Sequence, residues 1–365
     1  MSRLRIWLRR NPLSVLLLVL PFTLAAQLLG WPPAAVFILA AIGIIPLASY
    51  IGQATEDLAS HTDPRMGALL NATLGNAAEL IITIAAVRAG LLELVKASIT
   101  GSIIGNLLLV LGFAMAVGGI RHGTQRFNQR NASRNAILLV LAVITLVIPS
   151  VFSASLGGGT PTTLSAAGRS PVEALSIGVA VIMIAIYALG LFDSARTKET
   201  PLSTTLPKRD APSWTLGQSI AILAVSTLGV VWLSEALVQV AEAVIQGLGM
   251  SEFFMGIILV PLIGNVAEHL VAVQMALKNK MDLSTEIAIS SSLQIALFVA
   301  PLLVFVSLLL GHPLQLIFNR FELLALLAAV VIAVLVSSDG ESTWLEGAGL
   351  LAIYLILGLA FFLLP

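Results

Sequence analysis

Long apolar stretches recur from one end of the chain to the other and are separated by short polar segments. Each has about 20 residues, the length that an α-helix needs to cross a bilayer, and none alternates in the manner of a transmembrane β-strand. The pattern predicts an all-α polytopic membrane protein. We expect eleven spans, at residues 13–30, 34–58, 66–88, 92–118, 135–153, 172–193, 214–245, 252–277, 283–310, 315–336 and 343–363.

Lysine and arginine are divided unevenly between the two sides that these spans define. With the N-terminus inside, the inner segments receive 15 of these residues and the outer segments receive 4. Because cytoplasmic loops carry an excess of basic residues, we expect a cytoplasmic N-terminus and a C-terminus outside. The basic N-terminal residues then introduce a retained membrane helix, since no cleavage site with a polar mature start follows them.

Composition narrows the possible functions. Hydrophobic residues make up 58% of the chain and charged residues 10%, whereas soluble proteins carry about 25% charged residues. A net charge of zero gives no reason to expect nucleic acid as a partner. The chain has no cysteine, which excludes disulfides, thiolate metal sites and cysteine nucleophiles.

Two copies of one short motif lie in the apolar stretches. Residues 75–79 read GNAAE and residues 264–268 read GNVAE. A carboxylate in the membrane costs roughly 2.5–3.5 kcal/mol, so Glu79 and Glu268 need a functional reason. In each motif the asparagine precedes the glutamate by three residues and shares its helical face. The glycine before it can loosen the helix, and Pro261, seven residues before Glu268, favours a break in the span 252–277.

The next spans repeat a second pattern. Ser102 and Asn106 are four residues apart in one, and Ser290 and Gln294 are four residues apart in the other, so each pair shares a helical face. Without the first helix, ten spans divide into two sets of five that enter the membrane in opposite directions. Such inverted repeats place their site where the repeats meet. We therefore predict an N-terminal helix, two five-helix repeats and a cytoplasmic linker between them, at residues 1–32, 33–193, 214–365 and 194–213.

This supply of hard oxygen donors favours Ca²⁺, which takes 6–8 oxygen ligands in flexible geometry. Mg²⁺ prefers rigid octahedral coordination and retains its waters, and Zn²⁺ or Cu⁺ would need Cys or His. Two carboxylates neutralise one divalent ion. Without the ion, two carboxylates facing each other in a low-dielectric site repel, so we expect the site to take up protons. Competition between Ca²⁺ and H⁺ for the same oxygens suffices for an antiporter.

Four segments carry a resemblance to a known family. GNAAELI, GSIIGNLLLVLG, GNVAEH and SSLQIALFVAPLLV resemble, in this order, the paired repeat motifs of the Ca²⁺/H⁺ antiporter family within the calcium/cation antiporter superfamily. The resemblance implies Ca²⁺ and H⁺ as transported substrates, no cofactor, and alternating access. The sequence does not contain the family's long acidic cytoplasmic segment. In this respect it resembles a compact prokaryotic member, which would lie in the cell membrane.

The resemblance also implies roles for individual residues. The family's acidic ion ligands and proton acceptors fall on Glu79 and Glu268. Its supporting amide and hydroxyl positions fall on Asn76, Asn265, Ser102, Asn106, Ser290 and Gln294. Of these, Glu79, Glu268, Asn106 and Gln294 are the expected Ca²⁺ ligands.

Three further residues are candidates for the proton and ion path. Glu56 matches an acidic position that the family associates with cytoplasmic access. The alternative is that Glu56 is part of an ordinary solvated helix end beside Arg65. Glu235 either lines the outer path or pairs locally. His269 points about 100° away from Glu268 on a helix, so a helix–helix hydrogen bond is expected, with proton relay as the alternative.

Other functions stay open at this point. GNAAE and GNVAE replace the Thr-, Ser- and Pro-containing motifs of Na⁺/Ca²⁺ exchangers and so favour protons as counter-ion, but a Na⁺/Ca²⁺ or broader divalent-cation exchanger is the alternative. A channel of the same fold is a further one. An intramembrane hydrolase would need a nucleophile or an HExxH-type motif, and the chain offers neither. Stoichiometry and oligomeric state do not follow from the sequence.

Overall fold

The computed structural model describes residues 12–62, 64–156, 170–197 and 214–364, so most of the predicted linker 194–213 lies outside the described residues. The described chain is helical apart from turns, an extended segment and one small sheet, in which β1 (Gln125–Arg126) pairs antiparallel with β2 (Glu341–Ser342).

The helices follow the predicted apolar stretches closely. Here η1 is a 3₁₀ helix, and η2, η3 and η4 are π-helical turns within longer helices. The first part of the chain forms η1 (Pro12–Leu18), α2 (Val19–Leu28), α3 (Pro33–Ser60), α4 (Pro64–Leu74), α5 (Ala77–Arg88), α6 (Leu92–Ile104), η2 (Gly105–Val110), α7 (Leu111–His122), α8 (Gln129–Ser155) and α9 (Pro171–Thr197). The second part forms α10 (Leu216–Leu248), α11 (Glu252–Phe254), η3 (Met255–Leu259), α12 (Val260–Leu277), α13 (Met281–Gln294), η4 (Ile295–Val299), α14 (Ala300–Leu309), α15 (Arg320–Val336) and α16 (Trp344–Leu363).

Among the described residues, eight helices are long and apolar enough to cross a membrane. They cover residues 33–60, 92–122, 129–155, 171–193, 216–248, 252–277, 281–309 and 344–363. The other three predicted spans differ: 13–30 corresponds to the shorter apolar helix Leu13–Leu28, 66–88 is divided into α4 and α5, and 315–336 is helical only from Arg320. The count of eleven spans and the two inverted repeats therefore stay predictions.

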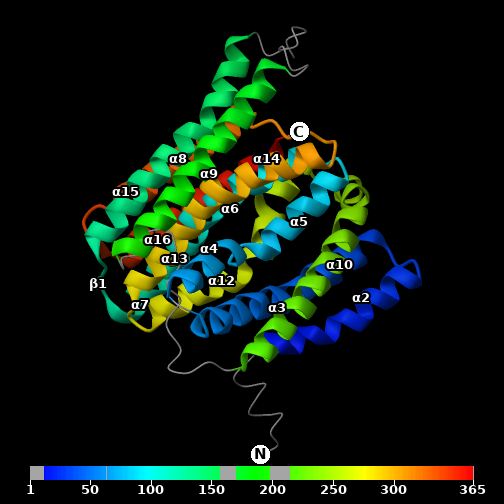
Figure 1. The fold of residues 1–365 in the computed structure, drawn as a ribbon, viewed down its shortest axis with the longest axis horizontal. Helices are drawn as coiled ribbons and strands as arrows, with labels where there is room; N and C mark the ends of the chain where they lie inside the picture. The colour runs from blue at the N-terminus through cyan, green and yellow to red at the C-terminus, as the bar shows by residue number, and fades with distance from the viewer. Residues whose placement is uncertain (1–11, 63, 157–169, 198–213, 365) are drawn as a thin grey trace, which may run out of the picture.

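The helices form a central group with a bundle on each side. On one side, α3 packs along α10, with α2 beside α3 (Figure 1). On the other side, α8 packs against α9 and α15. Two segments of the central group are the most buried: 78% of the apolar window in 92–122 and 67% of that in 281–309 lie inside the protein, against 22% for α16. Residues 92–122 and 281–309 contain the predicted Ser102–Asn106 and Ser290–Gln294 pairs.

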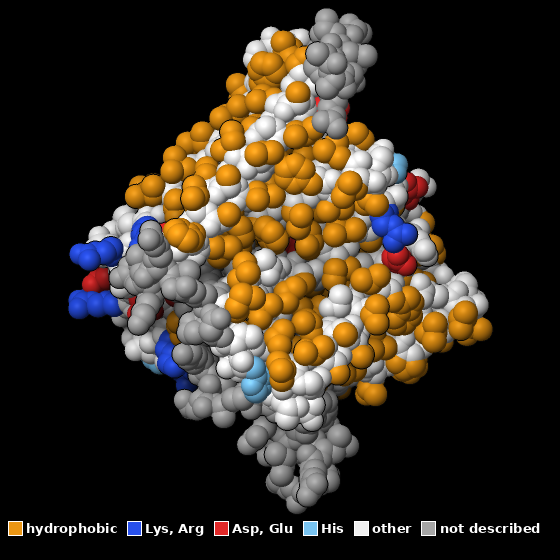
Figure 2. All heavy atoms as spheres, viewed as in Figure 1, with side chains coloured by type: hydrophobic (Ala, Val, Ile, Leu, Met, Phe, Trp, Pro, Cys, Tyr) orange, Lys and Arg blue, Asp and Glu red, His pale blue; other side chains and the backbone are white. Residues whose placement is uncertain are grey.

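The exterior is suited to a lipid environment. On α8, exposed side chains recur every three or four residues, at Ile137, Leu141, Ile144 and Ile148, and form an apolar stripe. Figure 2 shows a broad hydrophobic face, with Lys, Arg, Asp and Glu gathered toward its two opposite edges. This distribution agrees with helices that cross a membrane between two charged surfaces.

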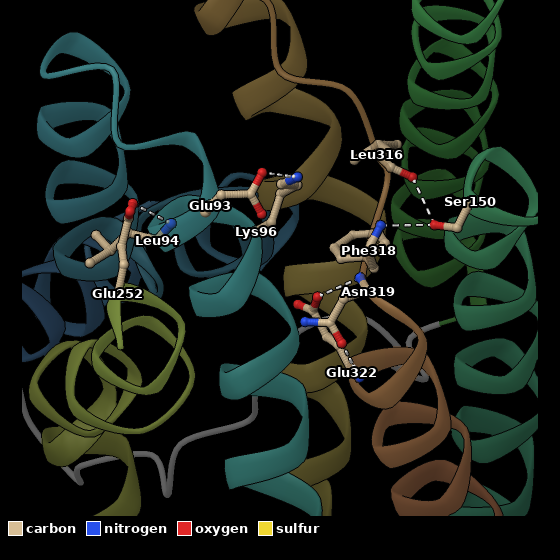
Figure 3. Close-up of polar contacts among 9 residues, drawn as sticks. All are labelled: Glu93, Leu94, Lys96, Ser150, Glu252, Leu316, Phe318, Asn319 and Glu322. Carbon is tan, nitrogen blue, oxygen red and sulfur yellow. Dashed lines mark hydrogen bonds and ion pairs between the residues drawn. The ribbon is translucent and has the colours of Figure 1, made fainter. Parts of the chain in front are cut away.

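The segment before α15 explains why that helix begins later than predicted. Serine hydroxyls bind its backbone: Ser150 Oγ accepts from Phe318 N at 2.9 Å and donates to Leu316 O at 3.3 Å (Figure 3). Ser176 accepts from Leu316 N, and Asn319 then caps α15 in a reciprocal pair with Glu322. Non-helical backbone at membrane depth requires such partners, so these contacts support an extended segment that the apolar pattern cannot distinguish from helix.

Two helices of the central group approach very closely. A Cβ built on Gly101 of α6 would lie 2.1 Å from Ile257 O of η3, and one built on Gly256 would lie 2.7 Å from Leu94 O. Only glycine permits this contact between backbones. The reciprocal glycines fix the crossing of residues 92–122 with residues 252–277, which carry the second motif.

Candidate functional site

The first motif lies at a break between two helices. α4 ends at Leu74 and α5 begins at Ala77, so Gly75 and Asn76 form the junction, as the glycine predicts. Glu79 consequently lies in the first turn of α5. The N-terminus of a helix carries partial positive charge and unsatisfied N–H groups. The break therefore places a carboxylate where a helix end stabilises negative charge inside the protein.

The second motif lies in an unbroken helix, although its span contains an irregularity near Pro261. α12 runs from Val260 to Leu277 through Gly264 and Glu268. The irregularity lies earlier, in the π-helical turn η3 (Met255–Leu259). It ends two residues before Pro261, which has no N–H to donate. The wider turn accommodates the proline, so the helix continues regularly through the motif.

The two motifs cross each other through their glycines. A Cβ on Gly264 would lie 3.3 Å from Glu79 Cα, and a Cβ on Gly75 would lie 3.7 Å from Glu268 Oε1. Each glycine thus packs against the glutamate of the other motif. The two carboxylates are close enough to repel when both are ionised.

Glu79 is held by neutral donors from two other helices. Ser102 of α6 donates a hydrogen bond to Glu79 Oε1, and Asn265 Nδ2 of α12 lies 3.3 Å from Glu79 Oε2. Asn265 Nδ2 also donates to Ser102 Oγ at 3.2 Å. Glu79 is 1% exposed, and no Lys or Arg among the described side chains pairs with it. The charge of an ionised Glu79 is therefore not neutralised by a basic residue.

A second set of contacts surrounds Glu268. Asn76 Nδ2 donates to Gln294 Oε1 at 2.7 Å, and Ser291 Oγ donates to Asn76 Oδ1 at 3.3 Å. The Ser291 side chain also lies close to the Glu268 carboxylate. Glu268 is partly exposed, unlike Glu79, although its Oε2 atom is buried and has no hydrogen-bond partner among the described residues.

We call these residues the carboxylate cluster. Its members share a direct contact with one of the two glutamates or with Asn76, and they are Asn76, Glu79, Ser102, Asn265, Glu268, Ser291 and Gln294.

Two predicted site residues lie at its margin. Asn106 is 1% exposed, and its Oδ1 atom accepts from His269 Nε2 at 3.1 Å, so it joins the cluster region through His269. This contact between η2 and α12 is the helix–helix hydrogen bond predicted for His269. Ser290 is fully buried, and its hydroxyl has no partner among the described residues.

Ser291 was not predicted from the sequence. The spacing of four residues selected Ser290 within the run Ser290-Ser291-Ser292. A different spacing identifies Ser291: Ser102 follows Glu79 by 23 residues, and Ser291 follows Glu268 by 23 residues. The equivalence of the two copies was thus the signal that could have found it.

Both helices that follow the motifs have a π-helical turn at the cluster. Asn106 lies within η2, and Gln294 directly precedes η4. A π-turn interrupts the regular hydrogen-bond ladder and is frequent at functional sites. Its occurrence at both amides indicates that the two copies share a local backbone distortion as well as a motif.

The remaining candidates lie outside the cluster. Glu235 of α10 forms an ion pair with Arg88 at 2.7 Å, and the side chains are 43% and 59% exposed, so the local pairing expected as one alternative is present. Glu56 lies in the last turns of α3 and is half-buried.

The cluster can hold one divalent cation. It offers two carboxylates, which neutralise such an ion, together with hydroxyl and amide oxygens on four helices. Among the described residues, no three or more His, Cys, Asp and Glu side chains lie together so that they could hold a metal ion, so the oxygens of Asn, Ser and Gln would have to complete the coordination. The donor set is thus that of a hard cation such as Ca²⁺ and not that of zinc or copper.

Comparison with known proteins gives a consistent result. The model of the sodium/calcium exchanger protein family matches residues 32–193 and 218–363. The chain is 43% identical to a Ca²⁺/H⁺ antiporter of Aphanothece halophytica and 45% identical to one of Synechocystis sp. (strain ATCC 27184 / PCC 6803 / Kazusa). The alignments cover 96% of this chain in both cases and 96% and 97% of the relatives. The structure resembles that of native YfkE with a TM-score of 0.82 at 40% identity, over 96% of this chain and all of that one.

Proposed function

The chain belongs to the sodium/calcium exchanger protein family, and from this premise we propose that it exchanges Ca²⁺ for H⁺ across a membrane as a secondary transporter. The relatives named above carry the name Ca²⁺/H⁺ antiporter, which agrees with the counter-ion that the GNAAE and GNVAE motifs favour. The observation that carries the proposal is the crossing of the two motifs, which brings Glu79 and Glu268 together without a basic partner.

The mechanism rests on competition for the same oxygens. Ca²⁺ binds when both carboxylates are ionised, because two negative charges then offset the charge of the ion. When Ca²⁺ leaves, repulsion and poor solvation favour protonation of one or both glutamates. Ser102, Asn265, Ser291, Asn76 and Gln294 orient the carboxylates and supply neutral oxygens. The bound ion and the bound protons are therefore mutually exclusive.

Transport requires that the cluster face the two sides of the membrane in turn. We propose that two five-helix repeats of opposite orientation, residues 33–193 and 214–365, move against each other to achieve this. Glu79 is buried and Glu268 is only partly exposed. This difference supports access to the cluster from one side at a time.

The orientation and the location complete the proposal. The excess of Lys and Arg on one side supports a cytoplasmic N-terminus and an outer C-terminus in a prokaryotic cell membrane. Glu56 then lies toward the cytoplasmic entrance, and Glu235 with Arg88 toward the outer one. His269, bonded to Asn106, is positioned to pass protons at the margin of the cluster. A proton gradient would drive Ca²⁺ out of the cytoplasm.

The test is ⁴⁵Ca²⁺ uptake into proteoliposomes driven by an imposed pH gradient. Glu79→Gln and Glu268→Gln keep the size of the side chain but cannot provide a negative charge or exchange a proton. We expect each substitution to abolish uptake while the protein still inserts and elutes as a folded species. Glu242→Gln, an exposed change on α10, is the matched control and should transport normally. Full exchange by either cluster variant would overturn the assignment of the site.

The alternative is exchange of Ca²⁺ for Na⁺. Its support is the family itself, whose description names sodium. The same vesicles separate the two functions, because a Na⁺ gradient without a pH gradient drives uptake only if Na⁺ is the counter-ion. Uptake with Na⁺ alone would favour the alternative and would leave the roles of Glu79 and Glu268 as Ca²⁺ ligands intact.

A further inference from the structure

Glu322 of α15 is a buried carboxylate outside the carboxylate cluster. It is 2% exposed and lies within the predicted span 315–336. It forms no ion pair with the described Lys and Arg side chains, and Lys96 of the neighbouring helix α6 pairs with Glu93 at 2.6 Å (Figure 3). A carboxylate buried at membrane depth is costly and usually marks a function. The burial of Glu322 therefore needs a functional reason.

Capping of α15 accounts for only one of the two carboxylate oxygens. Glu322 Oε2 accepts from Asn319 N at 3.1 Å, which closes the capping box (Figure 3). Gln218 of α10 and Glu346 of α16 occupy the same position in capping boxes of their own. Gln218 is exposed and Glu346 is half-buried, and within the described part of the chain both bind only the cap residues of their own helices. Capping thus does not require a buried side chain.

The second oxygen of Glu322 binds the helix that carries Ser102. Thr100 Oγ1 of α6 donates to Glu322 Oε1. Two carbonyl oxygens of α6 lie near the same hydroxyl, Lys96 O at 3.3 Å and Ala97 O at 3.2 Å. A threonine within a helix can satisfy its hydroxyl with such carbonyls, so Thr100 does not need a carboxylate for its own sake. The contact with Glu322 instead joins α6 to α15.

Thr100 and Ser102 hold α6 from opposite sides. They are two residues apart and therefore about 200° apart around the helix axis. Thr100 donates to Glu322 on one side, and Ser102 donates to Glu79 of the cluster on the other. A rotation of α6 that breaks one of these hydrogen bonds consequently displaces the donor of the other.

The neighbouring backbone contacts constrain this rotation less. Gly101 lies against Ile257 O, but van der Waals contacts are individually weak. The π-helical turn η2 begins three residues after Ser102 and interrupts the regular hydrogen-bond ladder. A hydrogen bond, in contrast, weakens steeply as its angle departs from linearity. The bond between Thr100 and Glu322 is therefore the contact best suited to fixing the orientation of Ser102.

We propose that Glu322 is a positioning residue for the carboxylate cluster. Through Thr100 it holds α6 at the rotation in which Ser102 donates to Glu79, and it acts through this helix without binding the ion. The inference deepens the proposed exchange of Ca²⁺ for H⁺ and rests on it. Its consequence is specific: loss of the bond between Thr100 and Glu322 weakens Ca²⁺ binding only while Ser102 is present.

The experiment is a double-mutant cycle on the full-length protein in detergent. Equilibrium dialysis with ⁴⁵Ca²⁺ gives the apparent Kd of the unchanged chain, Thr100→Val, Ser102→Ala and the double variant. Thr100→Val replaces the hydroxyl by a methyl group of similar size. We expect it to raise the apparent Kd about fivefold or more in the unchanged chain, as couplings between contacting residues do, and less than about twofold in the Ser102→Ala background. Equal rises in both backgrounds, or no rise in either, would overturn the proposal.

Two variants of α6 serve as matched controls. Thr100→Ser keeps the hydroxyl and should bind Ca²⁺ like the unchanged chain. Ser98→Ala removes a buried hydroxyl of the same helix that has no hydrogen-bond partner among the described residues, and it should also leave the apparent Kd unchanged. A rise with either variant equal to that of Thr100→Val would assign the effect to the packing of α6 and refute the positioning role.

Glu322→Gln approaches the same bond from α15, and it tests the proposal even where Thr100→Val does not fold. Glutamine can still close the capping box, but it is a weaker acceptor than a carboxylate. The apparent Kd should rise in the unchanged chain and not in the Ser102→Ala background, whereas Glu346→Gln, the same change in the capping box of α16, should have no effect. Equal values for Glu322→Gln and Glu346→Gln would refute the positioning role alone. An unchanged chain that binds no Ca²⁺ would overturn the proposed function as well.

Discussion

Ser291 and Ser292 are adjacent on α13, but their hydroxyl groups have different partners. Ser291 Oγ donates to Asn76 Oδ1 at 3.3 Å and lies close to the Glu268 carboxylate, whereas Ser292 Oγ donates to Ala288 O of its own helix at 2.9 Å. The two residues therefore form a matched pair: both are buried and have the same side chain, and only one belongs to the carboxylate cluster.

We predict that Ser291→Ala weakens Ca²⁺ transport and that Ser292→Ala does not. Ser291→Ala removes the donor of the buried Asn76 Oδ1, and an unsatisfied buried polar group costs about 1–3 kcal/mol; each 1.4 kcal/mol corresponds to about tenfold in affinity. The Ca²⁺ concentration for half-maximal uptake should therefore rise about tenfold or more for Ser291→Ala. Uptake into proteoliposomes over a range of Ca²⁺ concentrations measures it. Equal shifts in both variants would show that the contacts of Ser291 have no special role.

At the level of residues, sequence analysis predicted the site residues that occur in both motif copies. It missed Ser291, whose role depends on the rotation of α13 about its axis. The glutamates, Asn76, Asn265, Ser102 and Gln294 stood out because each occurs in two copies of a pattern, and the structure brings them into contact. Ser291 was missed because the spacing of four residues before Gln294 selected Ser290 from the three consecutive serines. Whether Ser290 or Ser291 faces Glu268 depends on the exact orientation of α13, which a pattern of polar residues does not define.

The contact between α6 and η3 depends on a glycine that lies directly against backbone. We predict that Gly101→Ala destabilises the protein, because its Cβ would lie 2.1 Å from Ile257 O, an atom that cannot move like a flexible side chain. Overpacking of this kind costs about 1–3 kcal/mol.

Gly105 is the matched control, one turn further along the same chain segment. A Cβ there would meet nothing within 4 Å, and alanine stabilises helices relative to glycine by roughly 0.5–1 kcal/mol. Thermal unfolding in detergent, followed by loss of the monodisperse gel-filtration peak, should give a lower Tm for Gly101→Ala and an unchanged or higher Tm for Gly105→Ala. The opposite order would contradict the close packing of these helices.

At the level of elements, the apolar pattern predicted helices well and interruptions less well. Gly75 correctly indicated the break between α4 and α5, because a glycine next to polar residues weakens a helix locally. Pro261 indicated an irregularity, but the helix absorbed it as the π-turn η3. The late start of α15 depends on Ser150 and Ser176, which lie far away in the sequence. Contacts of this kind are absent from any local pattern.

At the level of the whole molecule, the division of Lys and Arg remains the evidence for orientation, and the two motif copies remain the evidence for inverted repeats. The structure adds that the copies meet: Gly264 lies against Glu79, and Gly75 lies against Glu268. Sequence analysis could predict a shared site from duplication but not the manner of contact, because this depends on how long helices cross. The reciprocal packing implies that a movement of one motif must change the surroundings of the glutamate in the other.

This coupling leads to a prediction for the pH dependence of Ca²⁺ binding. If Ca²⁺ and protons compete for Glu79 and Glu268, binding of the ion must release the protons that the empty site held. Lowering the pH protonates the empty site and weakens Ca²⁺ binding, whereas raising the pH strengthens it until both glutamates are ionised without Ca²⁺. In the range where both are protonated, the apparent Kd should change by up to about a hundredfold per pH unit, since each released proton contributes about tenfold.

Titration calorimetry in buffers with different ionisation enthalpies directly measures the number of protons released per bound Ca²⁺. We expect up to two protons to be released per bound Ca²⁺ at low pH, one from each glutamate, with release falling toward zero at high pH. Glu242→Gln should leave the curve unchanged, because that side chain is exposed and far from the motifs in the sequence. A Ca²⁺ affinity that does not vary with pH would mean that the protons bind elsewhere. The two crossing motifs would then bind Ca²⁺, but Ca²⁺ and protons would not compete there.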